Sequence, residues 1–534
     1  MRTTITDGII SNNYKRLEEY FVNNISVDDH VKTYMVESSN LGYADPEFTG
    51  KYIDVCMHYY KNEMDTKALD NAKKVIDSII ANQRADGYLG CLEKGAELIG
   101  FSVWSQGFTI LGMLSYAEVT GDKNVIDAAL KCGQYIANAF IGEGGADIFE
   151  AENGGSEHIT VLYSMVKLWE KTKDGIIKDF IDHIINRCES SSMNIISFDN
   201  ILDLMSTKGI EMIVVYLGLI EYGKVFNNEA AIDAAGRYWK QIFDTQIRNT
   251  GNGTVGECWH KDGNKPAFLP IEGKPNETCV AVGWIELSLA LFWNRQNAEY
   301  LSAIEKTFFN HMLASVSSEG DDFAYYQSNY GQKITHTSKD AYKCCRYRGY
   351  TLFSCLPELL YYTDGYKIIP TLYVSSEYED AGVTIKCKTD YPASGHVEFD
   401  VTAKNDKKLC LRIPDFADKY SIYVNGVLKE IHLDGGFACI ELCGNMKIVL
   451  DFTYAPVINS VEINGDLYDE VIYGPLLLAS DTHYSEGIYK NDEIKSEKAD
   501  YSIVHFKYKG IDLVDYASAG RCDPEKDRYS VWIK

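Results

Sequence analysis

The 534-residue sequence lacks any uninterrupted apolar run long enough to cross a membrane. Its N-terminus also lacks the basic region and long apolar segment of a secretory signal, so we expect a cytoplasmic protein. Positive charge is scarce, because 52 lysines and arginines face 77 aspartates and glutamates, a formal net charge of −25. Such a chain repels phosphate groups, which argues against nucleic acids and anionic membranes as partners.

Disulfides are also expected to be absent. Without a visible export signal, the 14 cysteines are predicted to be free thiols, metal ligands or catalysts. Several of them, including Cys56, Cys132 and Cys188, lie within apolar helical patterns and are predicted to be small core residues.

The period of the apolar residues changes once along the chain. From about residue 10 to residue 365, apolar residues recur at helical spacing, as in 69–80 and 125–136. About a dozen such helices, paired by short joints, predict antiparallel helical hairpins. The chain lacks the strict repeat of a solenoid. Long Gly-rich connections favour a closed (α/α)6 toroid, or barrel, with the chemistry at the mouth that these loops form.

From about Tyr366 the apolar period becomes two, which is typical of half-buried strands. Asn425-Gly426 between two such runs predicts a tight hairpin turn. Regularly spaced short strands favour an antiparallel β-sandwich. We therefore expect a multidomain α and β protein, with an (α/α)6 barrel catalytic domain over 1–365, a β-sandwich over 366–460 and a small β region over 461–534.

One glutamate and three cysteines can complete a metal shell. Glu277 and Cys279 stand two residues apart, and Cys344 and Cys345 are adjacent. Adjacent cysteines do not easily form a disulfide with each other, but both can reach one ion. Thiolate ligands select zinc, and zinc keeps a thiol ionised. The alternative is that Cys279 is only packed on the inner face of its helix.

Glu257 is a candidate general acid. It follows a Gly-rich run and stands two residues before Trp259. A carboxyl in a loop beside an aromatic ring can have a raised pKa. A solvated loop glutamate is the alternative interpretation of the same residue.

The order of these motifs resembles glycoside hydrolase family 127, the β-L-arabinofuranosidase family. The shared order is Gly-Glu, a polar loop, Glu-x-Cys, a helix and Cys-Cys, and supporting stretches are Asp86-Gly87-Tyr88-Leu89, Leu411-Arg412-Ile413-Pro414 and Gly474-Pro475-Leu476. The resemblance extends from about Gly87 to Pro475. It implies a six-hairpin α/α toroid followed by β-sandwich modules, in agreement with the change of period.

The resemblance also implies a Zn2+ site and a mechanism. The ligands would be Glu277, Cys279, Cys344 and Cys345, with Cys344 as the nucleophile and Glu257 as the acid/base. A zinc-held thiolate would attack an anomeric carbon while a carboxyl protonates the leaving oxygen, so the anomeric configuration would be retained.

Three further residues match sugar contacts of the family: His158, Glu305 and Tyr325. Residue by residue, other interpretations stay open. Glu305 could be a charge on a helix surface, and Tyr325 could be a core aromatic.

The chain departs from the family where the family carries histidines along the sugar site. Phe101, Phe108 and Ile210 stand in those places. Sites built to bind hydroxyl groups discriminate strongly against ligands that lack them. The arabinofuranoside preference is therefore not carried over unchanged, and a deoxy or carboxylated pentose stays open. Arg346 or Arg348 could pair with a substrate carboxylate.

The leading interpretation is a cytoplasmic retaining glycosidase that acts on a small oligosaccharide or glycoside. One alternative is another zinc-thiolate enzyme on an α/α toroid, such as one that alkylates a bound thiol. A second is a non-catalytic carbohydrate-binding or scaffold protein whose zinc is structural. A homodimer is left open by the sequence.

Overall fold

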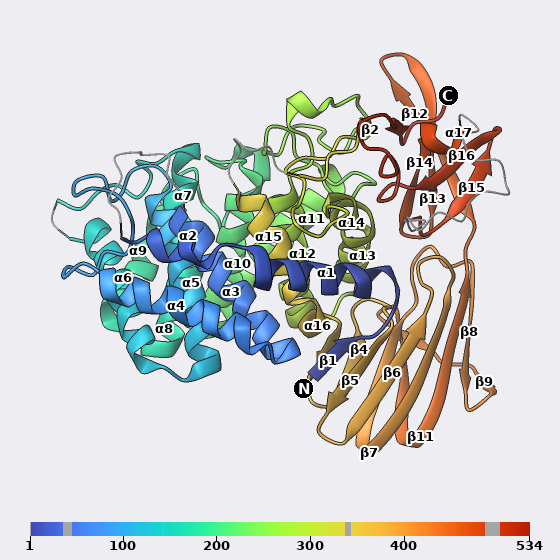
Figure 1. Ribbon diagram of the computed structural model, residues 1–534, viewed down its shortest axis with the longest axis horizontal. Coiled ribbons are helices and arrows are strands. Elements are labelled where there is room, and N and C mark those ends of the chain that lie inside the picture. The colour runs from blue at the N-terminus through green and yellow to red at the C-terminus, as the bar shows by residue number, and fades with distance from the viewer. Residues whose placement is uncertain (1, 36–44, 143, 337–342, 486–501) are drawn as a thin grey trace.

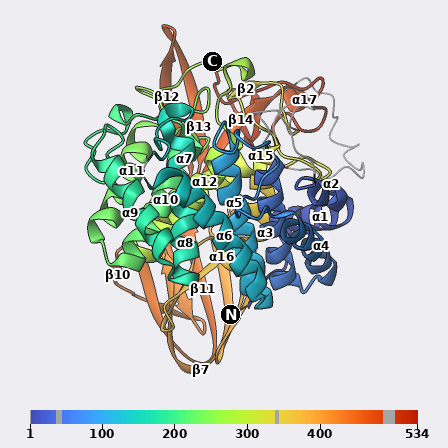
Figure 2. The same cartoon turned by 90° about the vertical axis from the view of Figure 1, so that its left-hand side faces the viewer.

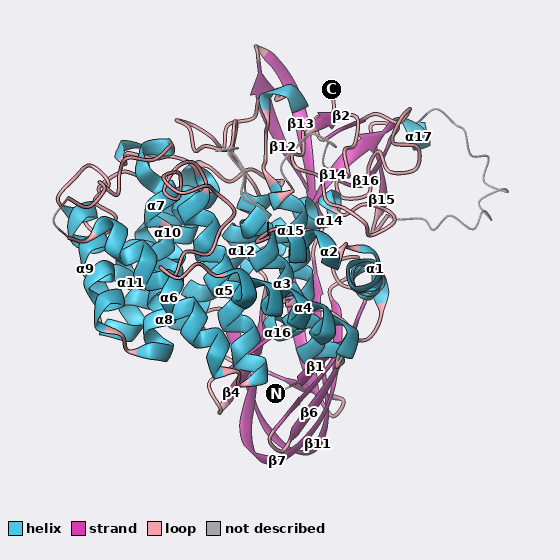
Figure 3. Cartoon of the chain, turned by 60° about the vertical axis from the view of Figure 1, so that its left-hand side comes forward, coloured by secondary structure: helices cyan, strands magenta, loops and turns pink. Residues whose placement is uncertain are grey.

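The computed structural model describes residues 2–35, 45–142, 144–336, 343–485 and 502–534. Helices occupy one part of the molecule and strands the other (Figures 1 and 3). Within the described ranges, none of the helices is both long and apolar enough to span a bilayer.

Six of the described helices form a closed ring. They are α3 (Asp45–Glu63), α5 (Ser102–Thr120), α8 (Val161–Thr172), α10 (Gly209–Phe226), α12 (Thr278–Arg295) and α15 (Cys344–Ser354). Each contacts the next in this order, and α15 contacts α3. The ring confirms the predicted barrel, and α10 is buried without a break over its first twelve residues because it is covered on all sides.

Each inner helix is covered by one outer helix (Figure 2). The outer helices are α4 (Thr66–Asn82) on α3, α6 (Lys123–Phe140) on α5, α9 (Gly175–Glu189) on α8, α11 (Glu229–Thr245) on α10, α13 (Ala298–Thr307) on α12 and α1 (Gly8–Asn24) on α15. The shorter helices are α2 (Val27–Lys32), α7 (Ser156–Ile159), α14 (Leu313–Ser315), α16 (Leu356–Leu359) and α17 (Thr482–Ser485).

The two ends of the barrel differ in loop length. Short joints lead from an inner to an outer helix. Gly121, at φ 72°, ends α5, and the Asp122 carboxylate caps α6 by accepting the Asn124 N–H at 2.9 Å. Long loops, such as 83–101 and 246–277, lead back to the N-terminus of the next inner helix. All long loops therefore gather at one mouth, although residues 143 and 337–342 of these loops lie outside the described ranges.

The strands form two sheets. The first is ordered β1-β5-β6-β7-β11-β8-β9, with β10 paired to β11, β4 to β7 and β3 to β4. Its strands are β1 (Arg2–Ile5), β3 (Tyr361–Thr363), β4 (Lys367–Pro370), β5 (Ser376–Asp380), β6 (Val383–Thr389), β7 (His396–Arg412), β8 (Lys419–Val424), β9 (Val427–Lys429), β10 (Leu433–Asp434) and β11 (Phe437–Thr453). The first strand of the chain thus joins this sheet, and β4 runs parallel to β7 in an otherwise antiparallel arrangement.

The second sheet is ordered β12-β13-β14-β16-β15, with β17 paired to β14 and β2. Its strands are β12 (Pro456–Ile463), β13 (Asp466–Tyr473), β14 (Leu476–Asp481), β15 (His505–Tyr508), β16 (Ile511–Asp515), β17 (Tyr529–Ser530) and β2 (Tyr330–Gly331). Because β2 comes from the loop before α15, this sheet also borders the barrel mouth.

The expectation that the chain has no disulfides is wrong at one place. Cys410 on β7 and Cys439 on β11 stand directly opposite each other and are disulfide-bonded. The strand register brings their Cα atoms to 4.0 Å. Two strands separated by a long connection fix this pairing, and the residue spacing gave no sign of it.

Candidate active site

Glu277, Cys279, Cys344 and Cys345 come together at the barrel mouth. One ligand atom from each lies within 4.8 Å of all the others. The Sγ atoms of Cys279 and Cys344 are 3.4 Å apart, and Cys345 Sγ lies 3.7 Å from Glu277 Oε1. Three of the four residues are buried, and Cys344 alone is partly exposed. We call these four residues the Glu-Cys cluster, and Cys344 is the one through which the cluster meets the mouth.

Local structure explains this convergence. Glu277 is the residue before α12, Cys279 lies in the first turn of α12, and α15 begins at Cys344. The two helices are neighbours in the ring and start at the same mouth. Thr254 Oγ1 accepts the Glu277 N–H at 3.1 Å, and the Asn252 side chain donates to the Glu277 carbonyl at 2.7 Å.

The Glu-Cys cluster has the donor chemistry of a metal site. Glu277 Oε2 is buried and has no hydrogen-bond partner among the described residues. Burial raises the pKa of the Glu277 carboxyl and of the Cys279 and Cys345 thiols well above their ordinary values. These three groups become ligands only when a cation replaces their protons. Three sulfurs and one carboxylate oxygen therefore fit a divalent ion of the zinc type.

Cys344 differs from the other two thiols. Hydrogen bonds from Cys279 and Cys345 lower its pKa well below the ordinary value, and Lys51 and Tyr325 add to this effect. The Tyr325 hydroxyl lies 3.3 Å from Cys344 Sγ. The surroundings thus favour a negative charge on this one sulfur.

Glu257 lies beside the Glu-Cys cluster with both carboxylate oxygens occupied. Oε1 accepts the Tyr326 hydroxyl, and Oε2 forms an ion pair with Lys208 Nζ. The side chain is only 15% exposed, so the solvated-loop interpretation is wrong. The Glu257 charge contributes to the raised pKa of Glu277, which places the two carboxyls near each other. A left-handed backbone at Glu257, with φ 68°, accompanies this orientation.

A second pair of carboxyls, Glu157 and Glu211, lies next to Glu257, and we call the three residues the carboxyl wall. Asn153 donates its side-chain N–H groups to Glu157 at 3.3 Å and to Glu211 at 3.1 Å. Burial raises the pKa of Glu157 to about 8 and that of Glu211 to about 7. The Glu257 charge also raises the pKa of Glu211, so the wall continues to the candidate acid/base. Sequence reasoning missed both residues, although Glu211 is a charge inside an apolar helix.

Lys51 and Glu47 were also missed. Both lie on α3, both are buried, and they form an i,i+4 ion pair. Lys51 Nζ lies 4.5 Å from the centre of the Phe108 ring. The charge of Cys344 raises the pKa of both groups, which places the pair near the Glu-Cys cluster. The i,i+4 spacing of a glutamate and a lysine was the available signal.

Two of the residues matched to sugar contacts lie elsewhere. Glu305 is buried and pairs with Arg412 of β7 at 2.5 Å, so it joins the barrel to the first sheet. Both ring nitrogens of His158 contact backbone carbonyls, Ile148 O at 3.1 Å and Leu98 O at 3.0 Å. The structure therefore brings only Tyr325 of the three to the Glu-Cys cluster.

The apolar replacements and the two arginines have definite positions. Phe108 and Ile210 are buried, and Phe101 is half-buried. Arg348 forms an ion pair with Glu286, and Arg346 donates to the Asp321 carbonyl at 2.7 Å. Both arginines, named from the sequence as possible partners of a substrate carboxylate, thus already bind acceptors of the protein.

Comparisons with known proteins decide the family. The profile of the β-L-arabinofuranosidase GH127 catalytic domain matches residues 2–358, and that of the GH127 middle domain matches 367–450. The chain belongs to glycoside hydrolase family 127. It is therefore a glycoside hydrolase, and its substrates are glycosides. The chain is 22% identical, over 88% of its length and 80% of the relative's, to a non-reducing end β-L-arabinofuranosidase of Bifidobacterium longum subsp. longum.

Solved structures share the fold. A GH127 β-L-arabinofuranosidase from Geobacillus stearothermophilus T6 aligns with a TM-score of 0.76 at 14% identity, covering 100% of both chains. A second GH127 β-arabinofuranosidase aligns with a TM-score of 0.76 at 17% identity, covering 99% of this chain and 96% of its own. The barrel and the β modules of this family member are thus those of the family.

Proposed function

We propose that this GH127 member is a retaining glycosidase that cleaves β-L-arabinofuranosides, or glycosides of a related modified pentose. Cys344 would be the nucleophile and Glu257 the acid/base. The observation that carries the proposal is that Cys344, alone among the residues of the Glu-Cys cluster, is partly exposed and that the paired carboxylate of Glu257 lies near the cluster. A purely structural metal site, the non-catalytic alternative, would gain nothing from a partly exposed ligand residue.

We propose Zn2+ as the metal, held by Glu277, Cys279, Cys344 and Cys345. Sulfur-rich sets of four ligands favour zinc among common cellular metals. When bound, the ion supplies positive charge that keeps the Cys344 sulfur ionised near neutral pH.

Cys344 and Glu257 then have separate roles in the two steps of the reaction. In the first step the Cys344 sulfur forms a bond to the anomeric carbon, the glycosidic C–O bond breaks, and Glu257 gives its proton to the leaving oxygen. In the second step Glu257 takes a proton from water, the water oxygen bonds to the anomeric carbon, and the C–S bond breaks. Two inversions at one carbon retain its configuration.

The surrounding residues position these groups. Lys208 and Tyr326 hold the two oxygens of Glu257 and so fix its direction. The Tyr325 hydroxyl can donate to the Cys344 sulfur whenever that sulfur is negative. The protein thus orients both the nucleophile and the proton donor of the proposed reaction.

The second part of the proposal is the identity of the sugar. The Bifidobacterium relative is named for β-L-arabinofuranosides released from a non-reducing end. By the family resemblance, Phe101, Phe108 and Ile210 stand in place of imidazoles that would bind hydroxyls. We therefore propose a pentose with fewer hydroxyl contacts. Because Arg346 and Arg348 bind protein acceptors, a carboxylated sugar is the less favoured of the modified pentoses.

Two variants test the mechanism against a panel of aryl pentosides. Glu257→Gln should lower kcat by about 10²- to 10⁴-fold, the usual contribution of an acid/base, while the metal content stays unchanged. Cys344→Ser should abolish turnover whether or not the metal is retained. Glu272→Gln, an exposed glutamate on the same loop, is the matched control. Full turnover by Glu257→Gln would remove that residue from the mechanism.

Metal analysis tests the cofactor separately. We expect one zinc per chain, loss of turnover on chelation and recovery when zinc is restored. Full activity in metal-free protein would overturn the zinc assignment. The cytoplasmic location, the homodimer and the division into 1–365, 366–460 and 461–534 are proposals of the same standing.

A further inference from the structure

A cavity lies inside the barrel at the end opposite the Glu-Cys cluster. Its volume is about 470 Å³, within the usual range for small-molecule sites. The cluster occupies the first turns of α12 and α15, whereas this cavity is lined by later residues such as Glu286 and Trp293 of α12 and Cys355 after α15. None of the four cluster residues lines it. We call it the basal cavity.

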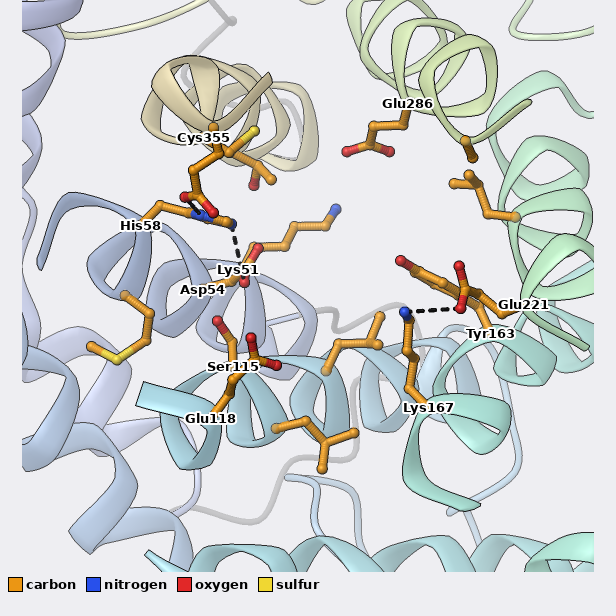
Figure 4. A pocket seen from close by; sticks show the side chains of 18 of the residues that line it. Lys51, Asp54, His58, Ser115, Glu118, Tyr163, Lys167, Glu221, Glu286 and Cys355 are labelled. Atoms are coloured by element: carbon orange, nitrogen blue, oxygen red, sulfur yellow. Dashed lines mark hydrogen bonds and ion pairs between the residues drawn. The ribbon is translucent and has the colours of Figure 1, made fainter. Parts of the chain in front are cut away.

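Side chains from the inner helices point into the basal cavity from all sides (Figure 4). Its charged groups are arranged as neighbouring pairs. Lys167 lies 3.1 Å from Glu221, Lys61 lies 2.6 Å from Glu358, and Arg348 binds Glu286. Since each of these three cations already faces a carboxylate, none of them is left to bind a small anion by charge alone. Among the described residues, the side chains that line the basal cavity do not form a group that could hold a metal ion either.

Alternating donors and acceptors suit a neutral ligand that carries several hydroxyl groups. A hydroxyl can accept from a lysine and donate to the adjacent carboxylate without leaving either charge unpaired. Apolar walls complete the site, and Trp293 presents a ring that is 46% exposed. An aromatic face beside polar groups matches a sugar, which has an apolar face and a hydroxyl rim.

The geometry points to a second sugar-binding site. We propose that the basal cavity binds a small neutral sugar, a mono- or disaccharide, separately from the catalytic mouth. Lys51 lines this cavity and pairs with Glu47 near the Glu-Cys cluster, and Arg348 stands one turn after Cys344 on the same helix. The two sites thus share supporting side chains. The proposal does not depend on the catalytic assignment.

Site-resolved thiol labelling of the full-length protein tests it. Cys355 reports the basal cavity, Cys344 reports the catalytic mouth, and the exposed Cys443 is an internal control. The probe is L-arabinose, and alkylation by iodoacetamide is followed peptide by peptide. At ten times its Kd, L-arabinose should slow the labelling of Cys355 by about tenfold and leave Cys443 unchanged. No protection of Cys355, or equal protection by sodium phosphate, would overturn the proposal.

Calorimetric titration with L-arabinose in a Cys344→Ser background gives a second, independent result. Adding Trp293→Ala should abolish the remaining heat of binding, whereas Tyr366→Ala, which removes a similarly exposed ring outside the cavity, should leave it unchanged. Absence of heat in the Cys344→Ser background, or the same heat after Trp293→Ala, would refute a basal sugar site. Either failure would leave the Glu257→Gln and zinc tests of the catalytic proposal untouched.

Discussion

The buried ion pair between Glu305 and Arg412 allows a test between two roles of Glu305. Its contacts indicate a structural residue, whereas the family resemblance implies a sugar contact. The two side chains are 1% and 2% exposed and lie 2.5 Å apart at the junction of barrel and first sheet. Breaking a buried pair leaves one uncompensated charge and typically costs about 3–5 kcal/mol. We therefore expect Glu305→Gln to lower the free energy of unfolding of the barrel by about 3 kcal/mol, the lower end, because glutamine can still accept a hydrogen bond.

The matched control lies on the same helix. Glu299 pairs with Lys240 at 2.9 Å, but these side chains are 34% and 47% exposed. Exposed pairs contribute at most about 1 kcal/mol, so Glu299→Gln should cost less than that. Urea unfolding followed by tryptophan fluorescence compares the two variants, and the double change Glu305→Leu with Arg412→Met should recover most of the loss.

The same variants decide between two roles for Glu305. A structural pair predicts unchanged KM for the folded enzyme, whereas a sugar contact predicts a raised KM with little loss of stability. If Glu305→Gln and Glu299→Gln cost the same free energy and only Glu305→Gln raises KM, the account of a structural pair is refuted.

Two further predictions concern the carboxyl wall. Lys208→Met should lower kcat by about 10- to 100-fold by releasing the direction of Glu257, and Lys208→Arg should restore most of it; equal kinetics for both variants would show that Lys208 does not position the acid/base. Burial raises the pKa of Glu157 from 4.5 to about 8, so its protonated form stabilises the fold below pH 4.5 and this contribution is lost as the pH rises to about 8. Glu157→Gln should therefore reduce the loss of unfolding free energy between pH 4.5 and pH 8 by at most about 4–5 kcal/mol, at 1.36 kcal/mol per pKa unit. The measurement is Tm against pH, which should fall less in this variant, while the exposed Glu170→Gln should follow the native profile.

Local patterns in the sequence determined the helical part of the fold. Apolar spacing and joints such as Gly121-Asp122 predicted paired helices, because caps and turn conformations depend on neighbouring residues only. The closure of the ring was an inference from the long loops. It is visible only as the contact between α15 and α3, which lie far apart in the chain.

The cysteines show the same difference between what local spacing predicts and what only long-range contacts decide. Glu-x-Cys and Cys-Cys carried their chemistry in their spacing, so the four cluster residues were named from sequence and lie within 4.8 Å in the fold. Cys410 and Cys439 carried no such spacing. Their bond follows from the register of β7 on β11, which depends on pairing between distant residues.

Sequence alone thus specified which residue types could bind a metal and attack a sugar. Only the tertiary structure decided what each charge faces. Lys208, the residue before α10, pairs with Glu257, whereas Glu305 of α13 pairs with Arg412 of β7. A buried charge must be paired, and the partner comes from whichever element packs against it, so its role is set by packing rather than by its neighbours in the chain.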